Sequence, residues 1–157
     1  VRLEGLSKRF GDVSALENVS LDIQDGELFV LLGPTGAGKT TTLRVVAGLE
    51  AQDAGSVYFD EACMDLTPPA FVFQQYSLYP GMTVYENLSF PLKSPLRRLE
   101  RAEIERRVRD AAQKLHITHL LERKTARLSG GEMQRVSIGR AIVREPRVFL
   151  MDEPLSN

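Results

Sequence analysis

One loop constrains this chain more than any other feature. Residues 33–40 spell G-x-x-x-x-G-K-T and directly follow the apolar run of residues 28–32. Glycines let a backbone curl so that its N–H groups converge on anionic oxygens at the start of a helix. Lys39 can reach the β- and γ-phosphates of a nucleotide, and the Thr40 hydroxyl suits Mg²⁺, which prefers oxygen ligands. This phosphate loop therefore predicts binding of ATP or GTP. The expected contacts are Gly33, Pro34, Thr35, Gly36, Ala37, Gly38, Lys39, Thr40 and the adjoining Thr41.

The bulk properties exclude several classes of function. A chain of 157 residues is long enough for one domain with a sizeable core. Its net charge of −1 provides no global field to attract nucleic acid or anionic lipid. No apolar run approaches the ~20 residues that a transmembrane helix needs. The single cysteine, Cys63, permits no intrachain disulfide.

The hydrophobic pattern alternates between strands and helices. We expect strands at 1–10, 18–24, 28–32, 55–60, 70–73 and 148–151. The run at 28–32 does not alternate, which is typical of a strand that is covered on both faces. We expect a first helix at 39–47 with Gly48 just beyond its end.

Later helices carry clear start signals. Thr83-x-x-Glu86 and Ser129-x-x-Glu132 are capping boxes, and the second helix is expected to run to about residue 144. Between them, apolar residues recur at helical spacing: Ile104, Val108, Ala111, Ala112 and Leu115. The predicted fold is α/β, a P-loop NTPase core with an N-terminal antiparallel β subdomain and a helical insertion. We assign residues 1–74 and 145–157 to the nucleotide-binding core and 75–144 to the helical subdomain.

Two further segments offer chemistry. The strand at 148–151 runs into Asp152, which can hold Mg²⁺, and Glu153, which can polarise an attacking water. An ordinary acidic turn is the alternative. Ser129-Gly130-Gly131 opens a helix whose N–H groups favour an anion. An ordinary capped helix is the alternative there, because the sequence alone supplies no second phosphate.

Two other clusters favour plain structural interpretations. Arginines at positions 97, 98, 101, 106, 107 and 109 form a basic stretch that RNA or lipid binding would explain. Glu100, Glu103, Glu105 and Asp110 interleave with them at helix-pair spacing, which favours a solvated helix face. His116 and His119 with Cys63 offer no recognisable metal-ligand spacing, so we interpret them as surface histidines.

The segment Ser129–Gln134 resembles the signature motif of ABC ATPases. With the phosphate loop and the strand ending in Asp152-Glu153, it matches that family in order and spacing over essentially the whole chain. In that family two ATPase domains pair head to tail. The resemblance implies that Ser129, Gly130, Gly131 and Gln134 contact the ATP held by a partner's phosphate loop.

The resemblance also implies individual roles. Val72-Phe73-Gln74 is similar to the family's Q-loop, whose glutamine touches Mg²⁺ and water and links the site to transmembrane subunits. Phe10, before Gly11, falls where the family places an aromatic ring on adenine; a core Phe at a strand end is the alternative. The expected catalytic residues are Glu153, Lys39 and Gln74, and the expected metal ligands are Thr40, Gln74 and Asp152.

Residues 73–80 and 83–87 resemble the ATPase subunits of bacterial sugar importers of the maltose importer type. Spermidine, phosphate-ester and iron importers share much of this pattern. The resemblance implies a peripheral protein on the cytoplasmic face of the inner membrane. Its partners would be a second ATPase subunit, transmembrane permease subunits and an upstream solute-binding protein, with no nucleic acid. Two alternatives stay open: a soluble ABC-type ATPase of DNA repair or translation, and a non-catalytic nucleotide-binding fragment.

The sequence departs from the family pattern in three places. The family continues beyond residue 157 with a D-loop aspartate, further strands and a switch histidine. The link from Thr67 to Ala70 is several residues shorter than in similar sequences, and Val1 starts in mid-strand. We therefore expect a C-terminally truncated, partial ABC ATPase domain.

Overall fold

The computed structural model describes residues 1–59, 68–94 and 99–153. Contacts within the chain divide it into two compact units, unit 1 at Val1–Pro69 and unit 2 at Ala70–Asn157. Each unit buries its own apolar residues, such as Leu6 in unit 1 and Val108 in unit 2. The assignment of 75–144 to a separate helical subdomain stays a prediction.

Unit 1 contains a three-stranded antiparallel sheet with the order β2-β1-β3. The strands are β1 (Arg2–Phe10), β2 (Val13–Asp22) and β3 (Ala54–Tyr58). Gly11, with a φ of 58°, makes the tight turn that lets Val13 pair with Phe10. The expected start of the second strand at residue 18 was therefore wrong, because the hairpin closes directly after Phe10 and recruits residues 13–17 into the ladder.

Helix α1 (Lys39–Val46) follows the phosphate loop, as the sequence predicts. It buries Thr42, Val45 and Val46. Gly48 follows the C-cap in the left-handed conformation, with a φ of 69°, and its N–H donates to the carbonyl of Val45 at 3.0 Å. The helix therefore ends where a residue without a Cβ allows it to end.

The expected buried strand at 28–32 is wrong for this structure. The segment is not a strand, and Leu28, Val30 and Leu32 expose 86%, 63% and 88% of their surface. A central strand needs a hydrogen-bonded neighbour, and neither of the sheets in the described part of the chain pairs with these residues. Apolar composition alone does not make this run a strand, because a strand also needs a neighbouring strand to pair with.

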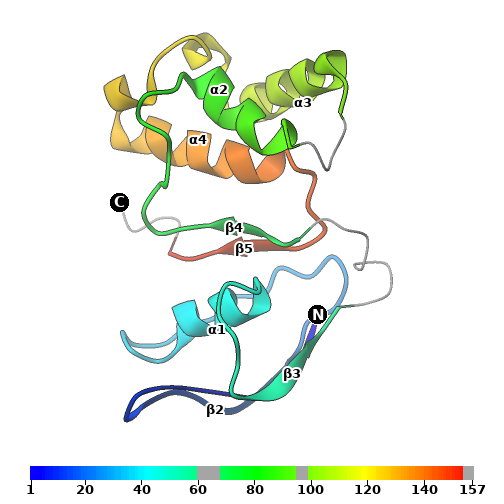
Figure 1. Ribbon diagram of the computed structural model, residues 1–157, viewed down its shortest axis with the longest axis vertical. Coiled ribbons are helices and arrows are strands. Elements are labelled where there is room, and N and C mark those ends of the chain that lie inside the picture. Colours follow the sequence, from blue (N-terminus) through cyan, green and yellow to red (C-terminus); the bar gives the residue numbers. More distant parts are fainter. Residues whose placement is uncertain (60–67, 95–98, 154–157) are drawn as a thin grey trace. The chain divides into compact units, whose positions relative to one another are not determined.

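Unit 2 is built on a parallel pair, β4 (Ala70–Val72) and β5 (Phe149–Met151). Val72 lies opposite Met151, and the Asp152 N–H extends the ladder by donating to the carbonyl of Val72 at 3.0 Å. Parallel strands need a long crossover, and here the crossover is helical (Figure 1). It comprises α2 (Val84–Ser89), η2 (Phe90–Leu92), α3 (Arg101–Lys114), η3 (Thr118–Leu120), η4 (Thr125–Arg127) and α4 (Gly130–Ile142).

The crossover helices pack around a common core. Val84, Leu88, Val108 and Val136 are fully buried within it. Gly139 allows α4 close to its neighbours, because a Cβ there would lie 2.7 Å from Leu88 Cδ2. Both predicted capping boxes are confirmed, at Thr83 with Glu86 and at Ser129 with Glu132.

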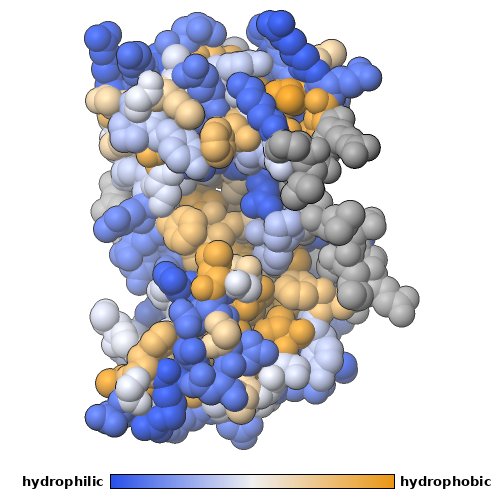
Figure 2. Space-filling model, viewed as in Figure 1, coloured by the Kyte–Doolittle hydropathy of each residue, from blue (hydrophilic) through white to orange (hydrophobic). Residues whose placement is uncertain are grey.

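The charged face of α3 is an ion-pair surface, as the sequence favours. Arg106 and Arg107 contact Glu103 at 2.8 and 2.6 Å, and Arg109 contacts Glu105 at 2.9 Å. On the face shown in Figure 2, hydrophilic side chains predominate over the helices of unit 2. Arg97 and Arg98 lie outside the described residues.

Within the described residues, none of the helices is both long and apolar enough to cross a membrane. No group of three or more His, Cys, Asp or Glu side chains within residues 1–59, 68–94 and 99–153 is placed to hold a metal ion. Cys63 lies outside those residues.

Candidate nucleotide-binding and catalytic site

The phosphate loop curls immediately before α1. Gly36 and Gly38 adopt left-handed conformations with φ of 85° and 82°, and Gly38 is the N-cap of the helix. The Lys39 ammonium folds back over the loop and donates to the carbonyls of Gly33 at 2.9 Å and Pro34 at 3.0 Å. The lysine charge is thus held at the loop itself, beside the N-terminus of α1, where anions are favoured.

Gly38 cannot be replaced without disturbing unit 1. A Cβ at this position would lie 2.4 Å from the carbonyl oxygen of Ala15 and 2.8 Å from Leu16 Cδ2. The loop therefore packs directly on the backbone of β2. This close approach, together with the positive φ, explains why position 38 of the motif requires a glycine.

Phe10 ends β1 and exposes 49% of its surface. The Lys8 ammonium lies 5.2 Å from the centroid of the ring and also contacts Glu50 at 3.1 Å. An exposed ring is not a core Phe, so the structural alternative raised by the sequence does not apply.

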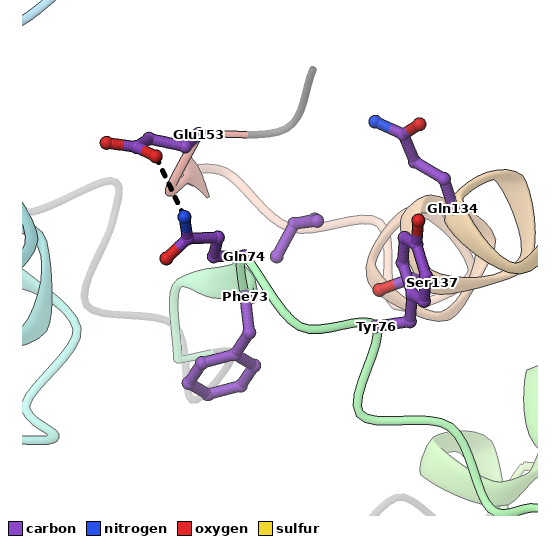
Figure 3. A pocket seen from close by; sticks show the side chains of 7 residues that line it. Phe73, Gln74, Tyr76, Gln134, Ser137 and Glu153 are labelled. Carbon is purple, nitrogen blue, oxygen red and sulfur yellow. Dashed lines mark hydrogen bonds between the residues drawn. The ribbon is translucent and has the colours of Figure 1, made fainter. Parts of the chain in front are cut away.

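In unit 2, the predicted catalytic residues Gln74 and Glu153 meet side chain to side chain. Gln74 Nε2 donates to Glu153 Oε2 at 2.9 Å (Figure 3). Gln74 follows β4 and Glu153 follows β5, so the parallel pairing of the two strands brings the two side chains to one edge. Asp152 immediately precedes Glu153 in the sequence and is 6% exposed.

A small pocket opens beside this pair. Figure 3 shows the side chains that line it, which come from the end of β4 and the segment after it, from α4 and from the segment after β5. They are Val72, Phe73, Gln74, Tyr76, Gln134, Ser137 and Glu153. Gln134 of the signature segment and Gln74 thus face one pocket in unit 2.

The signature segment Ser129–Gln134 forms the start of α4. Ser129 Oγ accepts from the Glu132 N–H at 3.4 Å and donates to the Glu132 carboxylate at 2.8 Å. The Ser129 N–H and hydroxyl both bond this carboxylate, and they hold the pKa of Glu132 below its usual value. Gly131 is exposed, and an added Cβ there would meet nothing within 4 Å.

The sequence profile of the ABC transporter family matches residues 16–156. The chain belongs to the ABC transporter family. Among curated relatives, the trehalose/maltose import ATP-binding protein of Thermococcus litoralis is 54% identical over 100% of this chain. An sn-glycerol-3-phosphate import ATP-binding protein of Rhizobium johnstonii is 49% identical, also over 100% of this chain. The ABC chain spans 45% and 46% of the length of these two relatives.

Solved structures agree with the fold of this ABC chain. An ATP-binding cassette solved as a dimer in a post-hydrolysis state with ADP and Pi superposes with a TM-score of 0.86 at 30% identity. The match covers 99% of this chain and 74% of that one. The predicted α/β class, with its antiparallel and parallel sheets, is therefore confirmed.

The predicted site residues of the ABC chain fall into two sets. Unit 1 holds the phosphate loop, Thr41 and Phe10, whereas unit 2 holds Gln74, Asp152, Glu153 and the signature segment. Sequence reasoning missed Tyr76, whose hydroxyl lies 3.4 Å from the position of a Cβ on Gly130, and Ser137. No spacing rule marks either residue, since their roles as pocket walls arise from how α4 packs beside the segment after β4.

Proposed function

We propose that this chain is the ATP-binding and ATP-hydrolysing part of a subunit that powers an ABC importer. The observation that carries the catalytic part of the proposal is the hydrogen bond between Gln74 and Glu153. It joins an amide that can orient a water to a carboxylate that can accept its proton, at the end of a strand beside Asp152. The import function is supported by the relatives, whose names describe import ATP-binding proteins.

The phosphate loop would bind the nucleotide. The N–H groups at the start of α1 and the Lys39 ammonium supply positive charge for the β- and γ-phosphates. Binding would draw the ammonium from the carbonyls of Gly33 and Pro34 toward the phosphates, exchanging neutral acceptors for charged ones. Phe10 would stack on the adenine with its exposed face.

The proposed magnesium ligands are the Thr40 hydroxyl, the Gln74 amide oxygen and the Asp152 carboxylate, each an oxygen donor. Hard cations prefer such ligands, and Asp152 is held at the end of β5 by its backbone bond to Val72. Bound Mg²⁺ would offset the negative charge of the phosphates. Glu153 would act as general base, and Gln74 would hold both the carboxylate and the attacking water in place.

The signature segment would serve a second copy of the subunit. Ser129, Gly130, Gly131 and Gln134 present a helix N-terminus, and Gly131 leaves open space before it. We propose that the nucleotide of a head-to-tail partner binds there. ATP binding would close the dimer and hydrolysis would release it.

The transported solute is a sugar or a related small molecule, in line with the sugar and glycerol-phosphate importers among the relatives. Recognition of that solute would belong to permease subunits and a solute-binding protein. The ATPase subunit would sit peripherally on the cytoplasmic face of the membrane, against its permease partners.

A binding measurement on the full-length protein tests the first step. Lys39→Ala should bind Mg-ATP weakly or not at all, because the phosphates lose a positioned ammonium. Lys114→Ala is the matched control, since Lys114 pairs with Asp110 on an exposed face of α3. Equal Mg-ATP affinity in wild type and Lys39→Ala, measured by equilibrium dialysis, would reject the phosphate loop as the nucleotide site.

A further inference from the structure

Three side chains form hydrogen bonds with the backbone of the segment Ser77–Tyr79, which lies three residues after Gln74 in the chain. Asn87, from α2, accepts from the Tyr79 N–H at 2.9 Å and donates to the Tyr79 carbonyl at 3.1 Å. Thr125, from η4, donates to the same carbonyl at 2.8 Å. Asn87 is 0% exposed and Thr125 is 2% exposed. Buried polar groups that satisfy one another in this way fix a unique backbone arrangement.

Arg140, from α4, is the third of these side chains. Its Nη1 donates to the carbonyl of Ser77, and its guanidinium carbon lies 4.6 Å from the centroid of the Tyr79 ring. One planar group thus holds both ends of the segment, by a hydrogen bond at one end and a cation–π contact at the other. Its Nε is buried, and the described residues offer it no hydrogen-bond partner. Arg140 as a whole is half-buried.

The backbone that Arg140 holds is strained. Ser77 has a φ of 49°, in the left-handed region that residues other than glycine rarely adopt. Its hydroxyl donates to the carbonyl of Gln75 at 3.1 Å, which closes the turn locally. A strained residue persists only where its surroundings over-determine it, and the bond from Arg140 to the Ser77 carbonyl supplies one of those constraints.

The position of Gln74 depends on this turn. Upstream, Val72 is fixed by its pairing with Met151 in β5. Downstream, Arg140 of α4 holds the carbonyl of Ser77. Gln74 lies between the two anchors, and its side chain reaches Glu153 from there. Releasing the downstream anchor would let the Gln74 backbone move while leaving β4 and β5 paired.

We propose that Arg140 is a positioning residue for Gln74, and that it ties the placement of Gln74 to helix α4. This inference rests on the proposed function, in which Gln74 and Glu153 act together in ATP hydrolysis. The same helix begins with the signature segment, so its two ends serve different tasks. Its N-terminus meets the partner's nucleotide, and its last turn holds the segment that places Gln74. A shift of α4 when the dimer closes would therefore be transmitted to the catalytic pair.

A double-mutant cycle in the full-length protein tests this role. Arg140→Met removes the guanidinium and keeps an apolar stem of similar length. A displacement of about 1 Å in a catalytic group lowers rates by up to ~10²-fold, so we expect kcat for ATP to fall ~10- to 100-fold while KM changes little. In a Gln74→Ala background, the same Arg140→Met change should lower kcat less than about twofold, because the group it positions is already gone. Arg109→Met, on the exposed face of α3, is the matched control and should be neutral in both backgrounds.

An equal fall in kcat in both backgrounds would overturn the proposal, since Arg140 would then act without Gln74. If Arg140→Met does not fold, Tyr79→Leu replaces it, because that change removes the stacked ring and leaves the backbone bonds to Asn87 and Thr125. Tyr79→Leu should show the same non-additivity with Gln74→Ala, and full additivity would reject the proposal.

A spectroscopic readout separates this inference from the proposed function. In ¹⁵N spectra, the side-chain amide signals of Gln74 should shift in Arg140→Met and stay in place in Arg109→Met. Unshifted signals in Arg140→Met would reject the positioning role, whether or not the protein hydrolyses ATP. Wild-type protein that neither binds nor hydrolyses Mg-ATP would instead reject the proposed function.

Discussion

Gln74 and Glu153 are 79 positions apart in the chain, yet the amide of one donates to the carboxylate of the other at 2.9 Å. The contact arises because each residue follows a strand of the parallel pair β4–β5, at the edge where both strands end. A carboxylate that accepts from an amide is held in one orientation without losing its charge. That is the condition a general base needs before substrate arrives.

Replacing the carboxylate isolates its chemical role. Glu153→Gln keeps the shape of the side chain and removes its capacity to accept a proton. Because a positioned general base contributes ~10²- to 10⁴-fold, kcat for ATP should fall by about that factor while nucleotide binding is retained. The variant should accumulate as an ATP-bound dimer, visible by light scattering. Hydrolysis at the wild-type rate would show that another group is the base.

Gly38 of the phosphate loop should tolerate substitution poorly. Gly38→Ala forces a left-handed conformation on an L-residue, which costs about 1–2 kcal/mol, and adds a clash with the Ala15 carbonyl at 2.4 Å. We expect both a lower free energy of unfolding and weaker Mg-ATP binding. Gly131→Ala is the control for stability, since its added Cβ meets nothing within 4 Å. Equal denaturation midpoints for the two variants would contradict the packing described for the loop.

The ion-pair face of α3 predicts a pH dependence of stability. Hydrogen bonds from Arg106, then Arg107, lower the pKa of Glu103 from its ordinary 4.5 to about 2. Because the pKa of Glu103 is lower in the folded state than in the unfolded state, the ionised carboxylate stabilises the fold. This stabilisation is complete above pH 4.5 and is lost as the pH falls toward 2. Wild type and Glu103→Gln should therefore differ in unfolding midpoint at pH 6 and converge as the pH approaches 2. A Glu103 carboxyl that titrates near pH 4.5 by NMR would show that these contacts do not persist in solution.

Local sequence patterns predicted the elements that are stabilised by interactions between residues close together in the chain. The capping boxes at Thr83 and Ser129, the helix on α3 and the C-terminal glycine of α1 all follow from hydrogen bonds and packing within a few residues. The apolar run at 28–32 was misjudged for the opposite reason. Its conformation depends on pairing with distant strands, and apolar composition alone does not supply a partner.

The same distinction between local and long-range interactions applies to the candidate site. The phosphate loop and the strand ending in Asp152-Glu153 carry their chemistry in adjacent residues, so the sequence reveals them. Asn87, Thr125 and Arg140 come from three separate elements, and all three contact the loop segment Ser77–Tyr79. Nothing in the spacing of these residues marks such a network, because it exists only after the helices of unit 2 have packed.

In the proposed function, each nucleotide is shared between the phosphate loop of one subunit and the signature segment of another. Mixing two full-length variants tests it: Gly131→Asp, which disables the signature segment, and Lys39→Ala, which disables the phosphate loop. The open space at Gly131 predicts that its variant folds and that its monomer still binds ATP. In a head-to-tail heterodimer one composite site would carry both lesions and the other would be intact. ATP-dependent dimerisation, followed by light scattering, should therefore be partly recovered in the mixture relative to either variant alone. No recovery between two folded variants, or loss of monomer ATP binding in Gly131→Asp alone, would contradict the shared-site account.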